Sequence, residues 1–174
     1  MKLHNVAFLT VIYLECIAYL KDFMVSLSDQ SFKKFDTVIF NDGVENFNKI
    51  TSEFSLNVIE IKISGTPAFI RQEAINYLIG NGYDVIIFGD SDDYFESRRV
   101  GTILKLLENY DIVVNDYDLV DKDGNCINKN YLSRRICDKT FIMPDSIVES
   151  NIFGFTNTAL KIKSREKHLF YDNL

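Results

Sequence analysis

The stretch "DVIIFGDSDDYFES", residues 84–97, joins an uninterrupted apolar run to four acidic side chains within seven positions. A run that is apolar at every position, as at residues 85–88, is typical of a strand covered on both faces in a parallel sheet. A strand is therefore predicted at residues 84–88, near the middle of the sheet. The acidic side chains that follow it are Asp90, Asp92, Asp93 and Glu96. Because like charges disfavour each other's ionised form, so dense a cluster favours a cation site over a simple turn.

The segments on both sides of this strand alternate between strand and helix patterns. Further strands are predicted at residues 6–12, 36–40, 57–61, 111–115 and 157–163. Helices are predicted from Leu14 onward, from Thr66 as N-cap to Gly80, and after Ser97 as N-cap. The middle helix is expected to bury Phe69, Ile70, Ala74, Leu78 and Ile79. This alternation predicts an α/β fold, a Rossmann-type α/β/α sandwich with a mainly parallel central sheet.

Composition limits the domain organisation and the partners. With 174 residues, 47% of them hydrophobic, the chain is predicted to form a single domain over residues 1–174. Its formal charge of −6 argues against a nucleic-acid partner, because proteins that bind phosphate backbones usually carry a basic face. A phosphorylated ligand must then be held locally, by a cation, an arginine or a helix N-terminus.

The cysteines and the hydropathy of the chain bear on the cellular compartment in which it acts. Cys16, Cys126 and Cys137 include no Cys-x-x-Cys pair, so neither a zinc site nor a disulfide framework is predicted, and Cys16 is interpreted as a small core residue. Reduced thiols suit the cytoplasm, where the chain is expected to act, either free or beside a membrane. No transmembrane segment is predicted, and Glu15 interrupts an apolar start that otherwise resembles a signal peptide.

Polar residues follow three of the predicted strands. They are Tyr13, Asn41-Asp42 and residues 90–93. Ligands of open α/β sheets bind beyond the carboxyl ends of the strands, so these groups are expected to converge. The chain has no Gly-x-Gly-x-x-Gly motif and no P-loop, so phosphates would be met through a metal. Asp90 and Asp92 can point to one side of the backbone, and Mg²⁺ or Mn²⁺ needs only one or two carboxylates besides phosphate oxygens.

The later part of the chain has a different pattern. A hairpin is predicted with its turn at Asp123-Gly124. A calcium loop is rejected, because alignment on Gly124 puts Leu119 at the first ligand position and Asn130 at the place of the bidentate Glu. Residues 129–139 form a basic segment.

Four blocks of sequence occur in an order that is typical of a known protein family. They are "VAFLTVIYL", "LSDQSFKKFDTVIFNDG", "TPAFIRQEAINYLIGNGYDVIIFGDSDDYF" and "VVNDYDLVDKDGNCI". Over about residues 5–160 the chain resembles family 2 glycosyltransferases of the GT-A fold, most specifically in the third block with its Asp-x-Asp-Asp motif. The resemblance implies an enzyme that takes a sugar from a nucleotide-diphosphate sugar, with Mn²⁺ or Mg²⁺ and with inversion. It implies a glycan or lipid-linked acceptor, as in polysaccharide biosynthesis, and it leaves the nucleotide open, with a UDP-sugar slightly favoured.

The resemblance also implies roles for the residues that would bind the nucleotide. Tyr13 would pack on the base, and Asp42 would accept a hydrogen bond from a ring N–H. Arg71 would contact the nucleotide or the diphosphate. A structural role is the alternative for each: a cap on the core for Tyr13, a turn for Asp42 and a solvated helix position for Arg71.

Further roles are implied for the acidic cluster and for a pair of arginines. Asp90 would face the ribose, and Asp92 would bind the metal that bridges the diphosphate, whereas Asp93 has no assigned role. Arg134 and Arg135 would either close over phosphate or acceptor or, as the simpler interpretation, belong to an exposed basic loop.

The catalytic base is the part that the sequence does not identify. In the family it is an acidic residue on the acceptor side, and here neither Glu166 nor Asp172 lies in a recognisable base motif, which leaves Asp172 as a weak candidate. The chain therefore resembles a truncated catalytic domain, with a donor half at residues 1–116 and a partial acceptor half at residues 117–174.

Two other functions remain open. A non-catalytic module that binds nucleotide sugars would explain the missing base. A nucleotidyltransferase would also use metal-binding aspartates after a sheet strand, but it should show a glycine-rich and basic loop after the first strand, and "VIYLECIAYLK" offers none.

Overall fold

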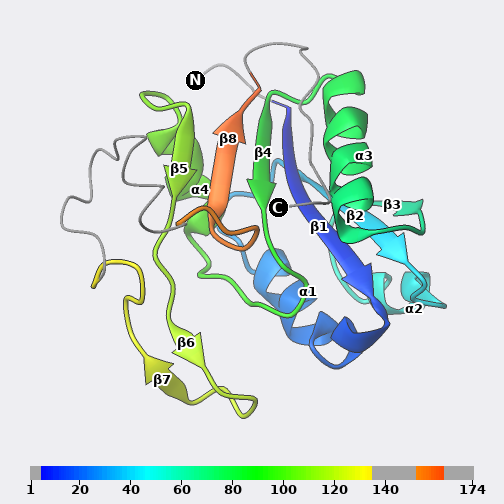
Figure 1. Ribbon diagram of the computed structural model, residues 1–174, viewed down its shortest axis with the longest axis horizontal. Helices are drawn as coiled ribbons and strands as arrows, with labels where there is room; N and C mark the ends of the chain where they lie inside the picture. The colour runs from blue at the N-terminus through cyan, green and yellow to red at the C-terminus, as the bar shows by residue number, and fades with distance from the viewer. Residues whose placement is uncertain (1–4, 135–151, 163–174) are drawn as a thin grey trace.

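A computed structural model describes residues 5–134 and 152–162, which form an α/β sandwich around a six-stranded sheet (Figure 1). In order across the sheet, the strands are β3 (Val58–Lys62), β2 (Asp36–Asp42), β1 (Val6–Tyr13), β4 (Val85–Phe88), β8 (Thr158–Lys161) and β5 (Ile112–Val114). The first four are parallel, whereas β8 is antiparallel to both of its neighbours. The predictions of a mainly parallel sheet and of a central strand at residues 84–88 are confirmed.

The strand order creates a point where the direction of the chain through the sheet reverses. After β1 the chain adds β2 and β3 on one side, and it then crosses to the other side of β1 to form β4. The loops that leave the carboxyl ends of β1 and β4 therefore run in opposite directions. Open α/β sheets bind their ligands in the crevice at such a switch point.

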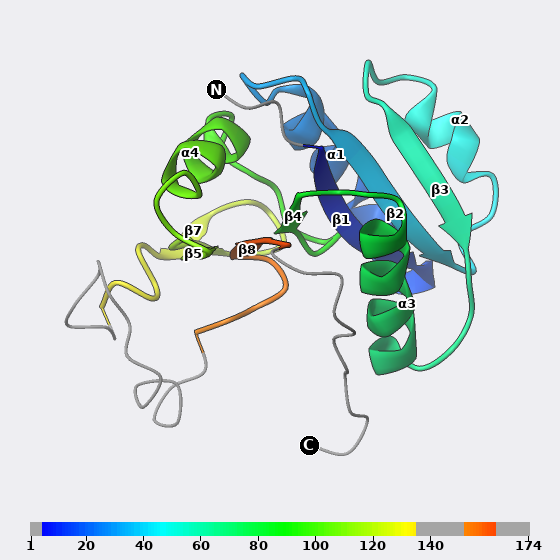
Figure 2. The same cartoon turned by 90° about the horizontal axis from the view of Figure 1, so that it is seen from above.

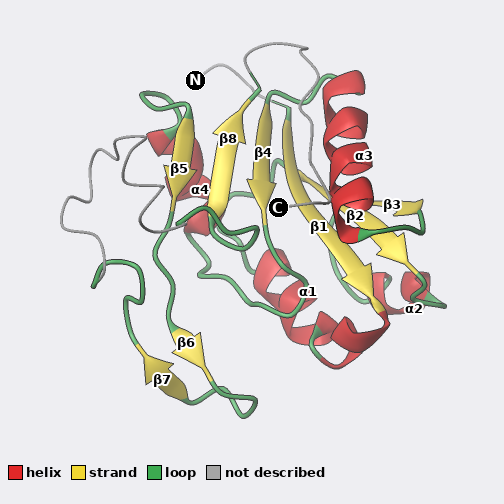
Figure 3. Ribbon diagram, viewed as in Figure 1, coloured by secondary structure: helices red, strands yellow, loops and turns green. Residues whose placement is uncertain are grey.

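Helices cover both faces of the sheet (Figures 2 and 3). They are the 3₁₀ helix η1 (Leu14–Ala18), α1 (Leu20–Ser28), α2 (Phe47–Thr51), α3 (Pro67–Gly80) and α4 (Arg99–Leu106). Residues of α1, α2 and α4 share one hydrophobic core, and residues of α3 share the other. Val85 and Ile87 enter the first core, and Ile86 and Phe88 enter the second, which explains why β4 is apolar at every position. Within the described ranges, no helix is long and apolar enough to cross a membrane.

The helix expected directly after β1 begins later than predicted. The chain first forms η1, and α1 starts at Leu20. The Cys16 thiol accepts a hydrogen bond from the Tyr13 N–H (3.3 Å) and donates one to the Tyr13 carbonyl (3.0 Å). Cys16 is buried in the core, as expected, and its two contacts hold the backbone of Tyr13 at the end of β1.

α3 begins as predicted but buries a partly different set of side chains. The Thr66 hydroxyl accepts a hydrogen bond from the Phe69 N–H at 3.3 Å, which confirms the N-cap. The prediction that Phe69 is buried is wrong, because its side chain is 48% exposed. Its ring lies over Gly65, where a Cβ would come within 2.5 Å of a ring carbon, and Ile75 enters the core.

The N-terminus of α4 is capped from another part of the chain. Ser97 is not the N-cap that the sequence predicted; that position is Arg98, without a side-chain cap. Instead, the buried Gln30 side chain accepts a hydrogen bond from the Val100 N–H at 3.0 Å. A residue after α1 thus satisfies a backbone donor that the local sequence leaves unpaired.

A small hairpin extends from the sandwich (Figure 1). It consists of β6 (Leu119–Val120) and β7 (Cys126–Asn128), which pair antiparallel. The predicted turn at Asp123-Gly124 is confirmed: Gly124 has φ +81°, a conformation that favours glycine.

Asp116 joins the two ends of the hairpin segment. Its carboxylate accepts hydrogen bonds from the N–H groups of Tyr117 (2.9 Å), Leu132 (2.8 Å) and Ser133 (3.2 Å) and from the Ser133 hydroxyl. The rings of Tyr117 and Tyr131 stack beside this junction, with centroids 5.4 Å apart. Asp116 therefore helps to close the base of the hairpin, together with the bond from the Tyr131 N–H to the Tyr117 carbonyl (2.9 Å).

Asp116 should make the stability of the chain depend on pH in the acidic range. Burial raises the pKa of this carboxyl, but the hydrogen bonds from Ser133, Leu132 and Tyr117 outweigh burial and lower it below its usual value. A lowered folded-state pKa means that the carboxylate stabilises the fold above about pH 4 and loses this effect as the pH falls through the folded pKa. Asp116→Asn should therefore lower the free energy of unfolding at neutral pH, with a difference from wild type that shrinks on acidification.

Urea unfolding from about pH 7 down to about pH 3 measures this difference. Asp123→Asn, at an exposed position of the hairpin turn, is the matched control and should change stability little at any pH. An Asp116→Asn effect that stays constant over the whole range would contradict the assignment.

Candidate functional site at the carboxyl edge of the sheet

The predicted site residues lie together at the carboxyl edge of the sheet. Tyr13 and Asp42 are register partners at the ends of β1 and β2. The pKa of Tyr13 is raised by burial and by the charges of Asp92, Cys16, Asp90 and Glu15, so its phenol senses the acids that follow β4. Arg71 of α3 lowers the pKa of Asp90 and so lies close to the same carboxylate. The edge thus combines an aromatic ring, a cation and several acids.

Residues 90–93, hereafter the acidic loop, follow β4 directly. Asp90 is half-buried, and burial, followed by the charges of Asp93 and Asp92, raises its pKa to about 6. Arg71 and Arg99 act in the opposite direction. A raised pKa of this kind means that burial and the neighbouring acids disfavour the ionised carboxylate. A cation added beside it would offset this cost, so the loop is a candidate cation site.

The other two acids of the loop have different surroundings. Asp93 is half-buried and accepts a hydrogen bond from the hydroxyl of Thr156, in the segment before β8. Burial raises the pKa of Asp93 even though the Thr156 hydrogen bond opposes this. Asp92 is exposed, and its carboxylate accepts no hydrogen bond from the described residues. Asp93 is therefore engaged within the fold, and Asp92 is open to a ligand.

The donor set fits a hard divalent cation that receives most of its ligands from phosphate and water. Within residues 5–134 and 152–162, no group of three or more His, Cys, Asp or Glu side chains could hold a metal by itself. Mg²⁺ and Mn²⁺ do not need such a group, because one or two carboxylates plus substrate phosphates suffice. Asp92 is exposed and open to such a cation, Asp90 lies two residues before it, and the buried Ser91 hydroxyl between them has no hydrogen-bond partner among the described residues.

An aromatic ring holds Arg71 against the acidic loop. The Arg71 guanidinium lies over the ring of Phe155, 4.6 Å from its centroid. Phe155 in turn packs on Phe88, the last residue of β4, with centroids 4.7 Å apart. This stacking restricts the arginine, whose charge lowers the pKa of Asp90. Arg71 is thus more than a solvated helix residue.

Asn41 and Gly43 form the turn after β2 and leave Asp42 at its edge. The Asn41 side chain donates to the Val44 carbonyl (2.8 Å) and accepts from the Val44 N–H (2.7 Å). Gly43 supplies the positive φ, +93°, that the turn requires. Because Asn41 makes the turn contacts, the half-buried Asp42 carboxylate is not needed for them.

Three residues near the acidic loop were not found by reasoning from the sequence: Arg99, Phe155 and Thr156. The sequence does contain a signal for the burial of Arg99, because Arg99 lies four residues before Ile103 and so shares the buried face of α4. Phe155 and Thr156 lie in an irregular segment without periodicity, so no local pattern indicates them.

The remaining candidates lie elsewhere. Arg134 is exposed and donates to the Asn128 side chain at 2.7 Å, which places it on the hairpin, in line with the simpler interpretation. Arg135, Glu166 and Asp172 lie outside the described residues.

A hollow of about 490 Å³ lies at the opposite edge of the sheet. It is lined by Asn5, Val6, Lys33, Lys34, Phe35, Asp36 and Asn57. The amino ends of β1 and β2 form this edge, which is not where parallel sheets place their active sites. The acidic loop, with its perturbed carboxyl groups, is the better candidate site.

Comparison with known proteins agrees with this geometry. No protein-family model matches the chain. The sequence is 33% identical over 107 residues, 57% of this chain, to the glycosyltransferase GlyA of Streptococcus pneumoniae serotype 4. The chain spans 15% of the length of that relative.

Solved structures share the arrangement of strands and helices. Residues 1–349 of TarS from S. aureus, in complex with UDP-GlcNAc, match with a TM-score of 0.57 at 19% identity, over 68% of this chain and 36% of that one. The mannosyltransferase PcManGT from Pyrobaculum calidifontis, in complex with GDP-Man and Mn²⁺, matches with a TM-score of 0.60 at 12% identity, over 91% of this chain and 44% of that one. The chain has a GT-A-like fold. In this GT-A-like domain, the acidic loop lies at the switch point between β1 and β4.

Proposed function

We propose that this chain contains the donor site of a metal-assisted, inverting glycosyltransferase of family 2. The observation that carries the proposal is the grouping of Asp90 and Asp92 with Tyr13 and Arg71 at the switch point of a GT-A-like sheet. Similarity to the glycosyltransferase GlyA supports it, as do the ligands UDP-GlcNAc and GDP-Man in the structural neighbours. The donor is then a nucleotide-diphosphate sugar, with a UDP-sugar slightly favoured.

Three side chains would bind the nucleotide part of the donor. The Tyr13 ring, 39% exposed at the end of β1, would pack on the base, and the neighbouring Asp42 would accept a hydrogen bond from a ring N–H. The Arg71 guanidinium, already stacked on Phe155, would pair with the diphosphate. These contacts orient the sugar toward the acceptor.

The acidic loop would complete the diphosphate site. Asp92, with its open carboxylate, would hold Mn²⁺ or Mg²⁺, and Asp90 would face the ribose. When bound, the metal supplies positive charge that stabilises the departing nucleotide diphosphate.

Transfer itself needs an acceptor and a base. The hydroxyl oxygen of a glycan or lipid-linked acceptor attacks the anomeric carbon from the side opposite to the diphosphate, which inverts the configuration as the diphosphate leaves. A carboxylate must take the hydroxyl proton. Asp172 stays the candidate for this role.

Calorimetric titration with UDP, GDP, CDP and dTDP, each with and without Mn²⁺, tests the donor site. We expect one nucleotide to bind, more tightly with the metal than without it. If no nucleotide binds under any condition, the proposal is wrong. Sugar-transfer and donor-hydrolysis assays on this chain and on a C-terminally longer one then separate an active enzyme from a binding module.

A further inference from the structure

Arg99, the first residue of α4, is a buried cation directly behind the acidic loop. Its side chain is only 7% exposed. Burial lowers its pKa to about 10, against the effect of Asp93 and Asp90, so it stays charged at neutral pH. A buried charge is costly unless it is paired and hydrogen-bonded, so its contacts should show what it does.

The Arg99 guanidinium joins three segments of the chain at the site edge of the sheet. Nη2 donates to the carbonyl of Phe88 at the end of β4 (2.8 Å) and to the carbonyl of Thr156 just before β8 (2.7 Å). Nε donates to Oδ1 of Asn115, which follows β5 (3.1 Å). β4, β8 and β5 are adjacent in the sheet, so one planar group ties their ends together.

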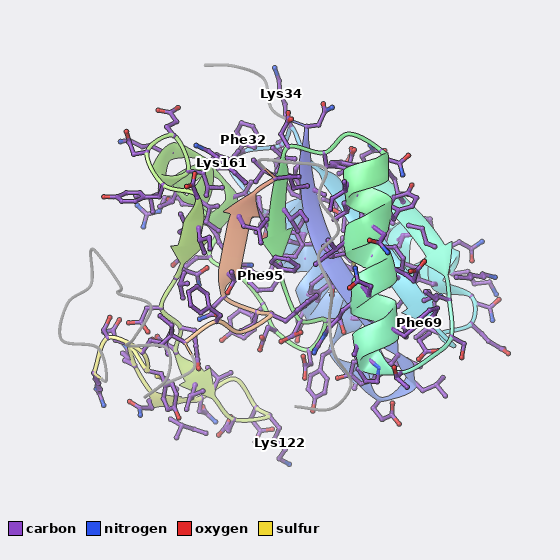
Figure 4. All side chains as sticks on the ribbon, turned by 45° about the horizontal axis from the view of Figure 1, so that its top comes forward. Phe32, Lys34, Phe69, Phe95, Lys122 and Lys161 are labelled. Atoms are coloured by element: carbon purple, nitrogen blue, oxygen red, sulfur yellow. The ribbon has the colours of Figure 1, made fainter. Side chains whose placement is uncertain are left out.

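Two aromatic rings fix the plane of this group. The guanidinium lies 4.4 Å from the centroid of Phe95 and 5.4 Å from that of Phe8. Phe95, labelled in Figure 4, comes from the segment between the acidic loop and α4 and packs on Phe8, with centroids 5.1 Å apart. The Arg99 guanidinium is therefore held by Phe95 on the side of the loop and by Phe8 on the side of the core.

A chain of two contacts leads from Arg99 to the acidic loop. Thr156 accepts from Arg99 with its carbonyl and donates to Asp93 with its hydroxyl. At the other end of the loop, the Phe88 carbonyl lies two residues before Asp90. Both ends of the acidic loop are thus connected to the same guanidinium, one through the Phe88 carbonyl and the other through Thr156.

We propose that Arg99 is a positioning residue that holds the acidic loop in the geometry required to bind a divalent metal together with a nucleoside diphosphate. It fixes the end of β4 directly and Asp93 through Thr156. This inference rests on the proposed function. Lysine cannot replace the arginine, because its single nitrogen cannot make bonds that diverge from Nε and Nη2.

The test compares Arg99→Lys with Arg98→Lys, an exposed arginine at the adjacent position. The nucleoside diphosphate that the wild-type chain binds is titrated into each variant by calorimetry, with and without Mn²⁺. Loss of groups that orient metal ligands typically reduces metal affinity about 10–100-fold, so Arg99→Lys should weaken Mn²⁺-dependent binding by at least about tenfold. Binding without metal should change less than about twofold, and Arg98→Lys should match wild type in both. A merely structural role would lower both affinities together.

Thr156→Val supplies a second, independent variant. It removes the hydroxyl that reaches Asp93 and leaves the carbonyl that Arg99 uses. It should cause a similar selective loss, and the double variant should lose less than the two single losses combined, because both act on one contact chain. If Arg99→Lys does not fold, Thr156→Val still tests the part of the proposal that runs from Arg99 through Thr156 to Asp93, and an unchanged Thr156→Val then overturns it.

The outcomes separate the two proposals. Wild-type chain that binds no nucleotide overturns the proposed function and this inference together. Wild-type chain that binds a metal–nucleotide pair, with Arg99→Lys and Thr156→Val unchanged or weakened equally with and without metal, overturns only the positioning role.

Discussion

Asp92→Asn should abolish most of the metal-dependent nucleotide binding, with a fall in affinity of at least about 100-fold, and leave the fold intact. The loss should be this large because Asp92 is the exposed carboxylate of the acidic loop and would bind the metal directly, whereas groups that only orient ligands already contribute about 10–100-fold. The fold should tolerate the change, because the carboxylate accepts no hydrogen bond from the described residues and surface substitutions of this kind cost within about 0.5 kcal/mol.

Calorimetry with the preferred nucleotide and Mn²⁺ measures the affinity, and urea unfolding measures the stability. Glu96→Gln is the matched control, since Glu96 belongs to the same acidic stretch and is also exposed, but lies outside the acidic loop. It should bind metal and nucleotide as wild type does. Unchanged metal dependence in Asp92→Asn would place the cation elsewhere.

Gly89→Ala is expected to lower the free energy of unfolding by about 2 kcal/mol through a single added methyl group. Gly89 joins β4 to the acidic loop, and a Cβ there would lie 2.5 Å from the Phe8 ring and 2.7 Å from the Phe95 ring. Phe8 is completely buried and packs against Phe23 and Phe35 as well, so its ring has little freedom to move away. The added methyl must therefore displace a packed aromatic cluster or the backbone.

Gly80→Ala is the control for this change. Gly80 ends α3, and a Cβ there would meet no atom within 4 Å. Alanine should leave stability unchanged or raise it by up to about 1 kcal/mol, because it restricts the unfolded chain and favours the helix. Urea unfolding of both variants gives the comparison. A Gly89→Ala variant as stable as wild type would show that the rings adjust freely, contrary to the packing described.

The main elements of the fold could be predicted because they depend on local patterns. The uniform run at 85–88 identified the central strand, and Thr66 with Pro67 identified the start of α3. The short helix α2 (Phe47–Thr51) was not predicted, and the other errors occurred at the ends of elements, where contacts between distant residues decide. Ser97 does not cap α4, because the side chain of Gln30 reaches its N-terminus from the end of α1.

The candidate site was predictable in part for a similar reason. Tyr13 and Asp42 end their strands and Asp90 follows its strand, and the rule that carboxyl ends of parallel strands share one edge is enough to bring them together. Arg71 required the resemblance to glycosyltransferases, since nothing in its local pattern distinguishes it from a solvated helix residue. Its partner Phe155 had no sequence signal.

The sequence by itself determined the alternation of strands and helices and the place of the acidic cluster at the end of a buried strand. Periodic burial is a property of each segment, so it is encoded locally. Only the tertiary structure decided the partners of that cluster. Thr156 is 63 positions from Asp93 and 57 from Arg99, and they meet because β8 enters the sheet between β4 and β5. Such contacts depend on strand order, which no local pattern of residues specifies.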